Sequence, residues 1–187
     1  MFDELKTTRL TIRKFKPSDV DGLFKVLSDA EVMRYIEAPF TLEQTADFVE
    51  QYGICANPLV FALIFDKSNC DAPNHSTGTS DDESRAESRL IGHVIFHPYP
   101  DENLARKFGT VYEMGFVIAK EFWHLGIASE ITGELINYSK ENGINALVLE
   151  CDRDNVASIR IAEKFSFYGT TTADSPGASL LTFILPL

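Results

Sequence analysis

The sequence predicts an α/β fold in which helices cover the faces of a mixed sheet. Apolar residues alternate with polar ones in some segments and recur every three to four positions in others, patterns that are typical of strands and helices respectively. Strand-like and helix-like segments follow one another along the chain, which favours a layered α/β architecture. The 187 residues, 44% of them hydrophobic, are enough for one core, and we expect a single domain over residues 1–187.

The first third of the chain contains a strand and a group of helices. Leu10 and Ile12 alternate with Thr11 and Arg13, which predicts a half-buried strand that ends before a proline. The segments expected here are a strand at 10–15, a helix from 17 that stops at 28–29, a helical turn around 32–36, and a helix that begins after the cap Thr41 and ends at Gly53.

A polar insertion interrupts the middle of the chain. Residues 66–89 contain many Ser and Asp and no large apolar residue, which is the composition of a mobile loop. The insertion separates two apolar runs, LVFALIF at 59–65 and LIGHVIFHP at 90–98, which predict two strands of one hairpin. We therefore expect the insertion to add little to stability or to chemistry.

The second half of the chain alternates strands and helices more regularly. After a polar stretch at 99–110, an apolar run predicts a strand, and Gly126 begins a helix that ends at Asn142. The segments expected here are strands at 111–118 and 146–151, a helix capped by Asp154 or Asn155 that runs to Lys164, and strands at 167–171 and 180–185.

Composition excludes several classes of partner. Seventeen Lys and Arg against 28 Asp and Glu give a net charge of −11, which repels nucleic-acid backbones and anionic lipid surfaces. Three cysteines without a CxxC pair predict neither a disulfide framework nor a zinc site, and fit a reducing compartment. No apolar run reaches the length of a signal peptide or a membrane span. We expect a cytoplasmic protein without nucleic-acid or membrane partners.

The sequence also gives no reason to expect a metal ion. His93 and His97 share one face of the strand at 90–98, but four residues of strand separate them too far to hold one metal. Both are interpreted as core or cleft histidines. Cys151 is interpreted as a small buried residue rather than a nucleophile.

The segment 111–129 carries the first sign of a binding site. A strand runs through a short loop into a helix that begins Gly126-Ile127-Ala128-Ser129, so several backbone N–H groups have no acceptor within the helix. Such an end attracts phosphate groups, and a glycine allows a diphosphate to approach the backbone closely. The same pattern also fits a helix start that serves only packing.

A second motif follows, and together the two resemble a known family. The chain has Tyr112-Glu113-Met-Gly115-Phe116, then Phe122-Trp123-His-Leu-Gly126-Ile-Ala128, and then the run NVASIRIAEKFSF at 155–167. These motifs, with the opening TRLTIR at 8–13, resemble the GNAT (GCN5-related N-acetyltransferase) superfamily, and most closely its RimJ/RimL-like branch. The resemblance covers the whole chain except the insertion.

The resemblance implies a fold and a cofactor. The fold is a mostly antiparallel mixed sheet of about seven strands, splayed at the acetyl-CoA site, with helices on both faces. The cofactor is acetyl-CoA, whose pantetheine amides pair with one strand while its diphosphate lies on a helix start. The implied cofactor-binding residues are Phe116, Val117, Ile118, Leu125, Gly126, Ile127, Ala128, Ser129 and Asn155. Asn155 also has the simpler reading of a helix cap.

Amide formation suggests the catalytic residues. An α-amino group has a pKa of about 8 and a lysine amine one of about 10.4, so a base must remove a proton before attack. Glu113 is the candidate base, acting directly or through water, although it could equally be an outward-facing strand carboxylate. The backbone near Phe116 would hold the developing oxyanion. Ser158 is the candidate donor to the departing thiolate.

Three positions depart from the family pattern. His124 and Ser166 stand where the family has glycine, and Ala162 stands where many members have a tyrosine that protonates the thiolate. We expect diphosphate binding to survive at His124 if its φ is negative, and we expect Ser166 to cause only a strained turn. The RimJ/RimL-like branch often lacks the tyrosine as well.

The acceptor is less defined than the cofactor. The resemblance favours the α-amino group of a protein or peptide, of the ribosomal-protein type. A small amine such as a polyamine, an amino acid or an antibiotic is the alternative, and a non-catalytic acyl-CoA-binding module is another. Segments 29–56 and 98–110 are expected to determine the acceptor. The protein is expected to be a monomer or a homodimer.

Overall fold

A computed structural model describes residues 2–66, 88–170 and 180–187 of the chain. Nearly all of the polar insertion expected at 66–89 lies outside these ranges, as does the turn expected between the last two strands. The elements below are therefore those of the described residues.

Eight strands are found in the described part of the chain, close to the positions that the apolar pattern predicts. The strands are β1 (Glu4–Lys6), β2 (Leu10–Arg13), β3 (Val60–Phe65), β4 (Arg89–Pro98), β5 (Val111–Ile118), β6 (Ala146–Asp152), β7 (Tyr168–Thr170) and β8 (Leu180–Pro186). The sequence did not predict β1, because three mostly exposed residues carry no apolar period. Its register places Leu5 opposite Ile12 of β2.

The strands form one sheet in the order β1-β2-β3-β4-β5-β6-β8-β7. All neighbours are antiparallel except β5 and β6, which are parallel. This arrangement confirms the mixed, mostly antiparallel sheet that the sequence predicted. The apolar run at 59–65 forms the buried strand β3, and β4 pairs with it as expected.

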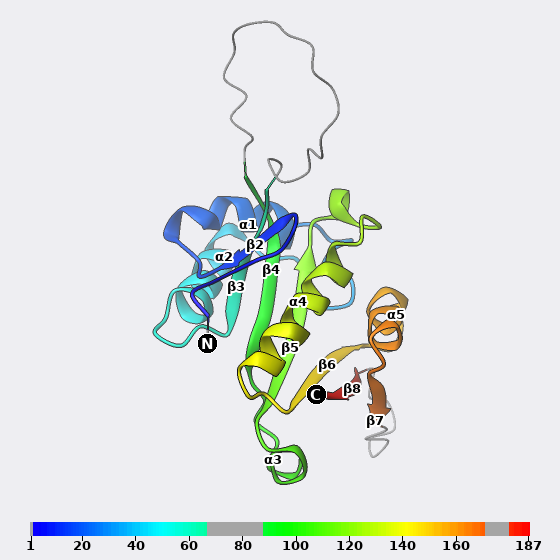
Figure 1. Ribbon diagram of the computed structural model, residues 1–187. Helices are drawn as coiled ribbons and strands as arrows, with labels where there is room; N and C mark the ends of the chain where they lie inside the picture. The colour runs from blue at the N-terminus through cyan, green and yellow to red at the C-terminus, as the bar shows by residue number, and fades with distance from the viewer. Residues whose placement is uncertain (1, 67–87, 171–179) are drawn as a thin grey trace, which may run out of the picture.

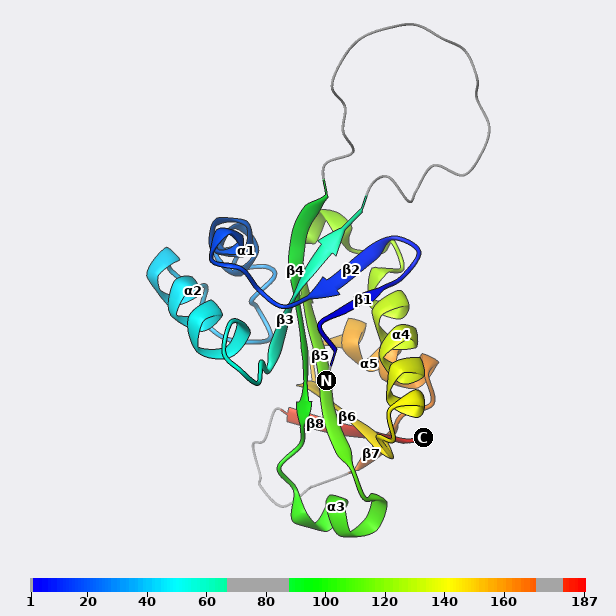
Figure 2. The same ribbon diagram turned by 60° about the vertical axis from the view of Figure 1, so that its left-hand side comes forward.

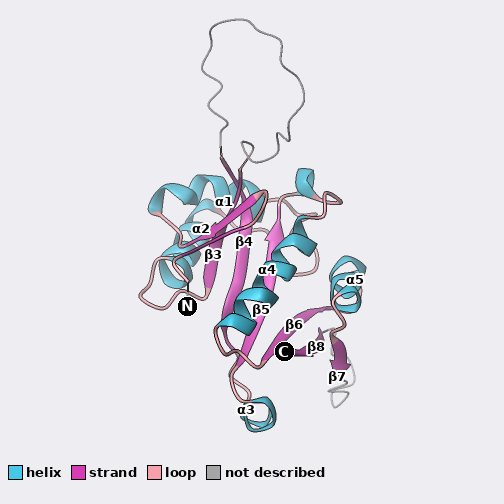
Figure 3. Ribbon diagram, viewed as in Figure 1, coloured by secondary structure: helices cyan, strands magenta, loops and turns pink. Residues whose placement is uncertain are grey.

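The helices are α1 (Val20–Leu27), α2 (Leu42–Phe48), α3 (Glu102–Phe108), α4 (Ile127–Glu141) and α5 (Val156–Lys164) (Figure 3). Thr41 caps α2 as predicted, since its side chain accepts a hydrogen bond from the backbone N–H of Gln44. The segment around Met33 forms the helical turn that was expected, since the Met33 backbone N–H donates to the carbonyl oxygen of Asp29 at 3.0 Å. The stretch at 99–110 was expected to be irregular but contains α3. This helix has no buried residue, and the cap Asp101 rather than an apolar face marks its start.

The helices lie on both faces of the sheet, as Figures 1 and 2 show. Helices α1 and α2 cover one face, whereas α4 and α5 cover the other, and α3 lies beyond one end of β5. Each face has its own apolar cluster: Ile127, Ile131 and Leu135 of α4 pack in one, and Leu23 and Leu27 of α1 pack in the other. Helices on both faces confirm the predicted layers.

The sheet parts between β5 and β6. The two strands pair over only three positions, from Val111 opposite Ala146 to Glu113 opposite Val148, and then diverge (Figure 1). A small apolar cluster that includes these strands' first residues and Ile184 of β8 packs at the point where they meet. The splay implied by the family resemblance is therefore present.

Candidate active site

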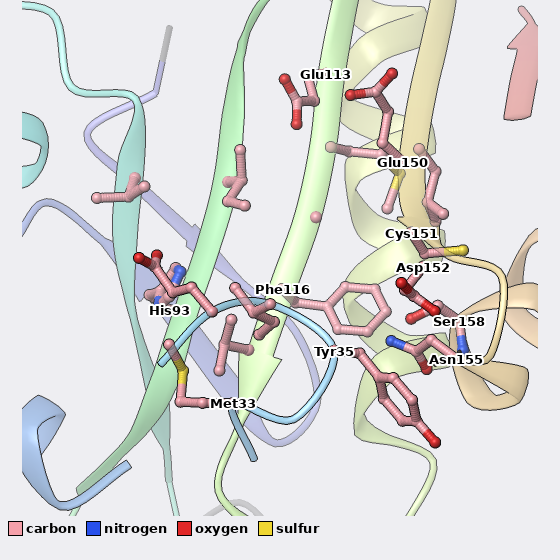
Figure 4. A pocket seen from close by; sticks show the side chains of 18 of the residues that line it. Met33, Tyr35, His93, Glu113, Phe116, Glu150, Cys151, Asp152, Asn155 and Ser158 are labelled. Atoms are coloured by element: carbon pink, nitrogen blue, oxygen red, sulfur yellow. Dashed lines mark hydrogen bonds between the residues drawn. The ribbon is translucent and has the colours of Figure 1, made fainter. Parts of the chain in front are cut away.

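A cleft of about 460 Å³ lies where β5 and β6 separate. Its walls include residues 113–117 of β5 and residues 149–152 of β6, and its far side is formed by the segments around α1 and α2. Figure 4 shows that side chains from β4, β5, β6 and α5 converge there. The cleft therefore has the start of α5 at one end, an acidic wall on β5 and β6, and an aromatic wall on the far side.

The loop that precedes α4 is defined by its backbone conformation and by one anchoring side chain. Trp123 anchors it, because the indole Nε1–H donates to the carbonyl oxygen of Ile118 at 2.8 Å. His124 and Gly126 both adopt left-handed conformations, with φ of +60° and +79°. The condition set above for diphosphate binding at His124, a negative φ, is therefore not met: the histidine takes a conformation that glycine adopts without strain. The two left-handed residues turn the chain directly into the first turn of α4.

The start of α4 fits an anionic group. Leu125 and Gly126 are exposed, and the helix leaves the first backbone N–H groups of 127–129 without acceptors of its own. The side chain of Ile127 is buried in the core, so this residue offers only its backbone. A Cβ on Gly126 would approach only Arg9 Nη2, at 3.6 Å, which leaves the outer side of the glycine open.

A pair of residues distant in sequence fixes this loop. The Arg9 Nη1 group donates to the carbonyl oxygen of Leu125 at 2.9 Å, and its Nε donates to Glu130 Oε2 at 2.7 Å. Thr7 also donates to Glu130. Burial raises the pKa of the Glu130 carboxyl, but these hydrogen bonds outweigh burial and hold the pKa below its usual value. The Arg9 clamp, meaning Arg9 with its contacts to Leu125 and Glu130, joins the start of β2 to the start of α4.

The residues expected to pair with the cofactor on β5 are not equivalent. The side chain of Phe116 points into the cleft (Figure 4). Val117 also lines the cleft, although its side chain is largely buried under α1 and α2. Ile118 is buried on the opposite face and does not line the cleft. Ile118 can therefore take part only through its backbone.

The start of α5 brings two of the predicted residues to the same cleft. Asn155 Oδ1 accepts a hydrogen bond from the Ser158 backbone N–H at 3.2 Å, so the residue is a helix cap. Both side chains line the cleft beside Phe116 (Figure 4). Lys164, two turns further on, donates to Ser129 Oγ at 2.9 Å and connects α5 to the first turn of α4. Ala162 is fully buried.

Glu113 lies in the cleft beside a histidine. Its side chain is 23% exposed, and its Oε2 lies 3.5 Å from His97 Nε2. Burial raises the pKa of Glu113, the adjacent His97 lowers it, and the negative charge of Glu150 raises it, with a net increase above the usual value. His97 Nδ1 lies 3.0 Å from the carbonyl oxygen of Pro98. A hydrogen on Nδ1 would leave the Nε2 lone pair facing Glu113.

Glu150 is a second carboxylate on this wall, and the sequence analysis did not select it. Tyr99 Oη and Thr182 Oγ1 both donate to Glu150 Oε1, at 2.9 and 3.0 Å. Burial and the neighbouring carboxylate raise the pKa of Tyr99, so the phenol keeps its proton. The parallel register places Glu113, Glu150 and Asp152 on one face of the sheet. Glu150 is the charged residue within the apolar run ALVLEC at 146–151, and a charge in such a strand is the signal that could have identified it.

The wall on the other side comes from the expected acceptor segment. The residues that line it include Met33, Tyr35, Glu37, Phe40, Phe48 and Tyr52. In contrast, residues 98–110 contribute no side chain to the described lining, and Tyr99 acts only from behind, through Glu150. Across the described lining there are four carboxylates, Glu37, Glu113, Glu150 and Asp152, and no Lys or Arg.

The described ranges contain neither a candidate metal cluster nor a candidate membrane span. Among residues 2–66, 88–170 and 180–187, no three His, Cys, Asp or Glu side chains are grouped so that they could hold a metal ion. Within the same ranges, no helix has the length and apolar character needed to cross a membrane.

Comparisons with known proteins extend over nearly the whole chain. Residues 9–167 match the family model described as Acetyltransferase (GNAT) domain. The uncharacterized N-acetyltransferase YnaD of Bacillus subtilis is 28% identical over 162 residues, which cover 86% of this chain and 79% of YnaD. The crystal structure of a GNAT-family acetyltransferase from Bacillus anthracis aligns with a TM-score of 0.73 and 26% identity over 98% of each chain.

A more distant structure has the same fold. It is an acetyl transferase from Salmonella typhimurium that modifies the N-terminal serine of a 50S ribosomal subunit protein. It aligns with a TM-score of 0.65 and 16% identity over 97% of this chain and 96% of its own.

Proposed function

The chain belongs to the acetyltransferase (GNAT) family, whose members use acetyl-CoA as the acetyl donor, and we propose that it acetylates the α-amino group of a protein or peptide by direct attack in a ternary complex. One observation carries this proposal: Glu113, Phe116, Asn155 and Ser158, which the sequence motifs single out, line one cleft at the splay. The Salmonella enzyme with the same fold acts on an N-terminal serine, which supports this choice of acceptor.

The donor is assigned to the side of the cleft near α4 and α5. The backbone N–H groups of Leu125 to Ser129 would hold its diphosphate, with the Arg9 clamp fixing their direction. The backbone of 116–118 and the side chain of Asn155 would bind the pantetheine arm. When bound, acetyl-CoA supplies an activated acyl group with a thiolate leaving group.

Glu113 is assigned the role of base. It would accept a proton from the incoming ammonium, directly or through water, and His97 could share that proton because its Nε2 lies 3.5 Å away. A carboxylate whose pKa is raised is a stronger base than an exposed one, and an α-amine, with a pKa of about 8, is easier to deprotonate than a lysine.

Two further groups would stabilise the charge that develops during attack. The backbone N–H near Phe116 would donate to the carbonyl oxygen, and Ser158 Oγ would donate to the departing sulfur. No acid at position 162 takes part, because Ala162 is buried and has no proton to give. Proximity of the two substrates in one cleft supplies much of the acceleration.

A small polyamine is a second candidate acceptor, and the cleft charge favours it. Four carboxylates without a Lys or Arg among the described lining residues would attract a molecule with more than one positive charge. A peptide with a free N-terminus and a basic side chain has the same charge. The distinction therefore requires an assay.

The test measures CoA release with peptides that have a free or an acetylated N-terminus, and with spermidine. We expect turnover with free N-terminal peptides, with mass spectrometry placing the acetyl group on the α-nitrogen. Turnover with spermidine alone would move the assignment to a small amine. Tight acetyl-CoA binding without turnover on any amine would contradict the proposal.

A further inference from the structure

His93 lies in the cleft wall and has an unsatisfied polar atom. It is in the middle of β4, and only 4% of the residue is exposed. Its Nδ1 has no hydrogen-bond partner among the described residues. Because buried polar atoms are almost always paired, such an atom requires a partner that the folded chain does not supply. The residue lines the cleft, but Nδ1 itself is shielded from solvent in the free protein, so a bound group reaches it only when a neighbouring side chain moves.

The surroundings of His93 are mostly aromatic. The centroid of its ring lies 5.2 Å from that of Phe48, and Tyr52 and Ile95 line the cleft nearby. Burial lowers the pKa of His93 to about 4, so the imidazole is neutral at physiological pH. A neutral imidazole offers one donor and one acceptor. It suits an uncharged hydroxyl or amide better than an ion.

The register of the sheet separates His93 from the candidate base. His97 lies opposite Glu113, and His93 lies opposite Val117, four residues further along β5. Four residues of strand span about 13 Å. Both histidines point to the same face, since they are an even number of residues apart. A single extended acceptor could therefore contact both ends of this wall.

We propose that His93 is a specificity-determining residue, whose Nδ1 binds an uncharged hydroxyl or amide group of the acceptor at a distance of several bonds from its reactive amine. The proposal rests on the proposed function, because it assumes an amine beside Glu113. A peptide satisfies the requirement, since an extended chain of about four residues covers 13 Å and carries amide groups throughout. A polyamine does not, because its polar groups are cationic.

The experiment compares His93→Leu and His93→Gln with Ile91→Val, a conservative variant on the same strand whose side chain is buried outside the cleft lining. Kinetics are measured with an N-terminal peptide and acetyl-CoA. We expect His93→Leu to lower kcat/KM for the peptide by roughly 10–100-fold, with KM for acetyl-CoA within twofold of wild type. His93→Gln should recover part of the loss, and Ile91→Val should change little.

Thermal unfolding supplies a readout that does not depend on the acceptor. If Nδ1 is unpaired in the free enzyme, His93→Leu should raise the unfolding temperature, by roughly 2–4 °C for a chain of this size. Unchanged peptide kinetics in His93→Leu would overturn the proposal, and His93 would then be a core residue paired with water. Equal losses toward acetyl-CoA and peptide would overturn it as well.

A binding measurement separates this proposal from the function on which it rests. Protein labelled with ¹⁵N-histidine is titrated with the same peptide in the presence of CoA. We expect the His93 Nδ1 resonance to shift, even if no amine is acetylated. If the peptide is acetylated but this resonance does not move, the proposed function survives and the role of His93 does not.

Discussion

Two parts of the candidate site are built in different ways: the loop at 123–129, called the backbone wall, which lies outside the described cleft lining, and the acidic wall of the cleft. The loop at 123–129 presents backbone N–H groups from one continuous stretch, and its shape depends on two left-handed residues and the Arg9 clamp. The acidic wall presents the side chains of Glu113 and Glu150, which come from separate strands. A backbone site tolerates side-chain changes but depends on conformation, whereas a side-chain site depends on chemical identity. Substitutions that change backbone conformation should therefore affect the backbone wall, and substitutions that change side-chain chemistry should affect the acidic wall.

The largest effect is expected on the acidic wall, from Glu113→Gln. The amide keeps the size of the side chain but cannot take a proton, so kcat should fall by roughly 10²–10⁴-fold. Binding of acetyl-CoA, measured by calorimetry, should be unchanged. Because the pKa of Glu113 is raised, the wild-type kcat should begin to fall on acidification at a pH above 4.5, and the variant should lack this step. A variant with full turnover would remove Glu113 as the base.

The backbone wall is tested next, by placing valine at either end of α4. Gly126 and Gly143 have φ of +79° and +69°, so valine at either position should lower the free energy of unfolding by about 2 kcal/mol. Only Gly126→Val should also weaken acetyl-CoA binding, by on the order of tenfold. A Cβ at Gly143 meets nothing within 4 Å, which makes it a matched control. Equal dissociation constants in both variants would refute the diphosphate placement.

The Arg9 clamp provides a smaller and more specific test. Arg9→Gln is compared with Arg13→Gln, because Arg13 makes a similar two-bond contact with Asp19 at 2.7 and 2.9 Å on the same strand. Both variants should lower the free energy of unfolding by about 1–3 kcal/mol. Arg9→Gln alone should raise the dissociation constant for acetyl-CoA, by roughly fivefold. If Arg13→Gln weakens binding equally, the clamp has no special role.

The smallest effects are expected at the two non-glycine residues that are left-handed within the described ranges. His124 and Ser166 have φ of +60° and +62°, so His124→Gly and Ser166→Gly should each raise the free energy of unfolding by about 0.5–1 kcal/mol. Urea unfolding measures this. Ser166 follows the end of α5 and does not line the cleft, so its variant should leave acetyl-CoA binding unchanged. His124→Gly should keep or strengthen binding, and weaker binding would show that the imidazole itself contributes.

The sequence predicted more of the backbone wall than of the acidic wall. Gly126, Ala128 and Asn155 lie in short motifs, because a helix start is a local feature that consecutive residues specify. The main strands and helices followed from apolar periods for the same reason. Helix α3 was missed because it has no buried face, and the insertion at 66–89 lies almost wholly outside the described residues.

The remaining contacts join residues that are far apart in sequence. Arg9 and Glu130 are 121 positions apart, and Tyr99 and Glu150 are 51 apart. The packing of α4 against the sheet and the register of the strands bring such pairs together, and a single sequence specifies neither. The same is true of His93, whose unpaired Nδ1 is a property of three-dimensional packing.

The parting of β5 and β6 also gives this sheet two edges in its interior. Each strand is paired on its outer side, with β4 and β8, but beyond Glu113 and Val148 the inner sides face each other without a ladder. A free edge invites pairing with a strand from another molecule and so promotes aggregation. A slender chain with amide groups that lies in the gap would pair with one edge and shield the other. Bound acetyl-CoA would then reduce edge-to-edge association between molecules in addition to supplying the acetyl group.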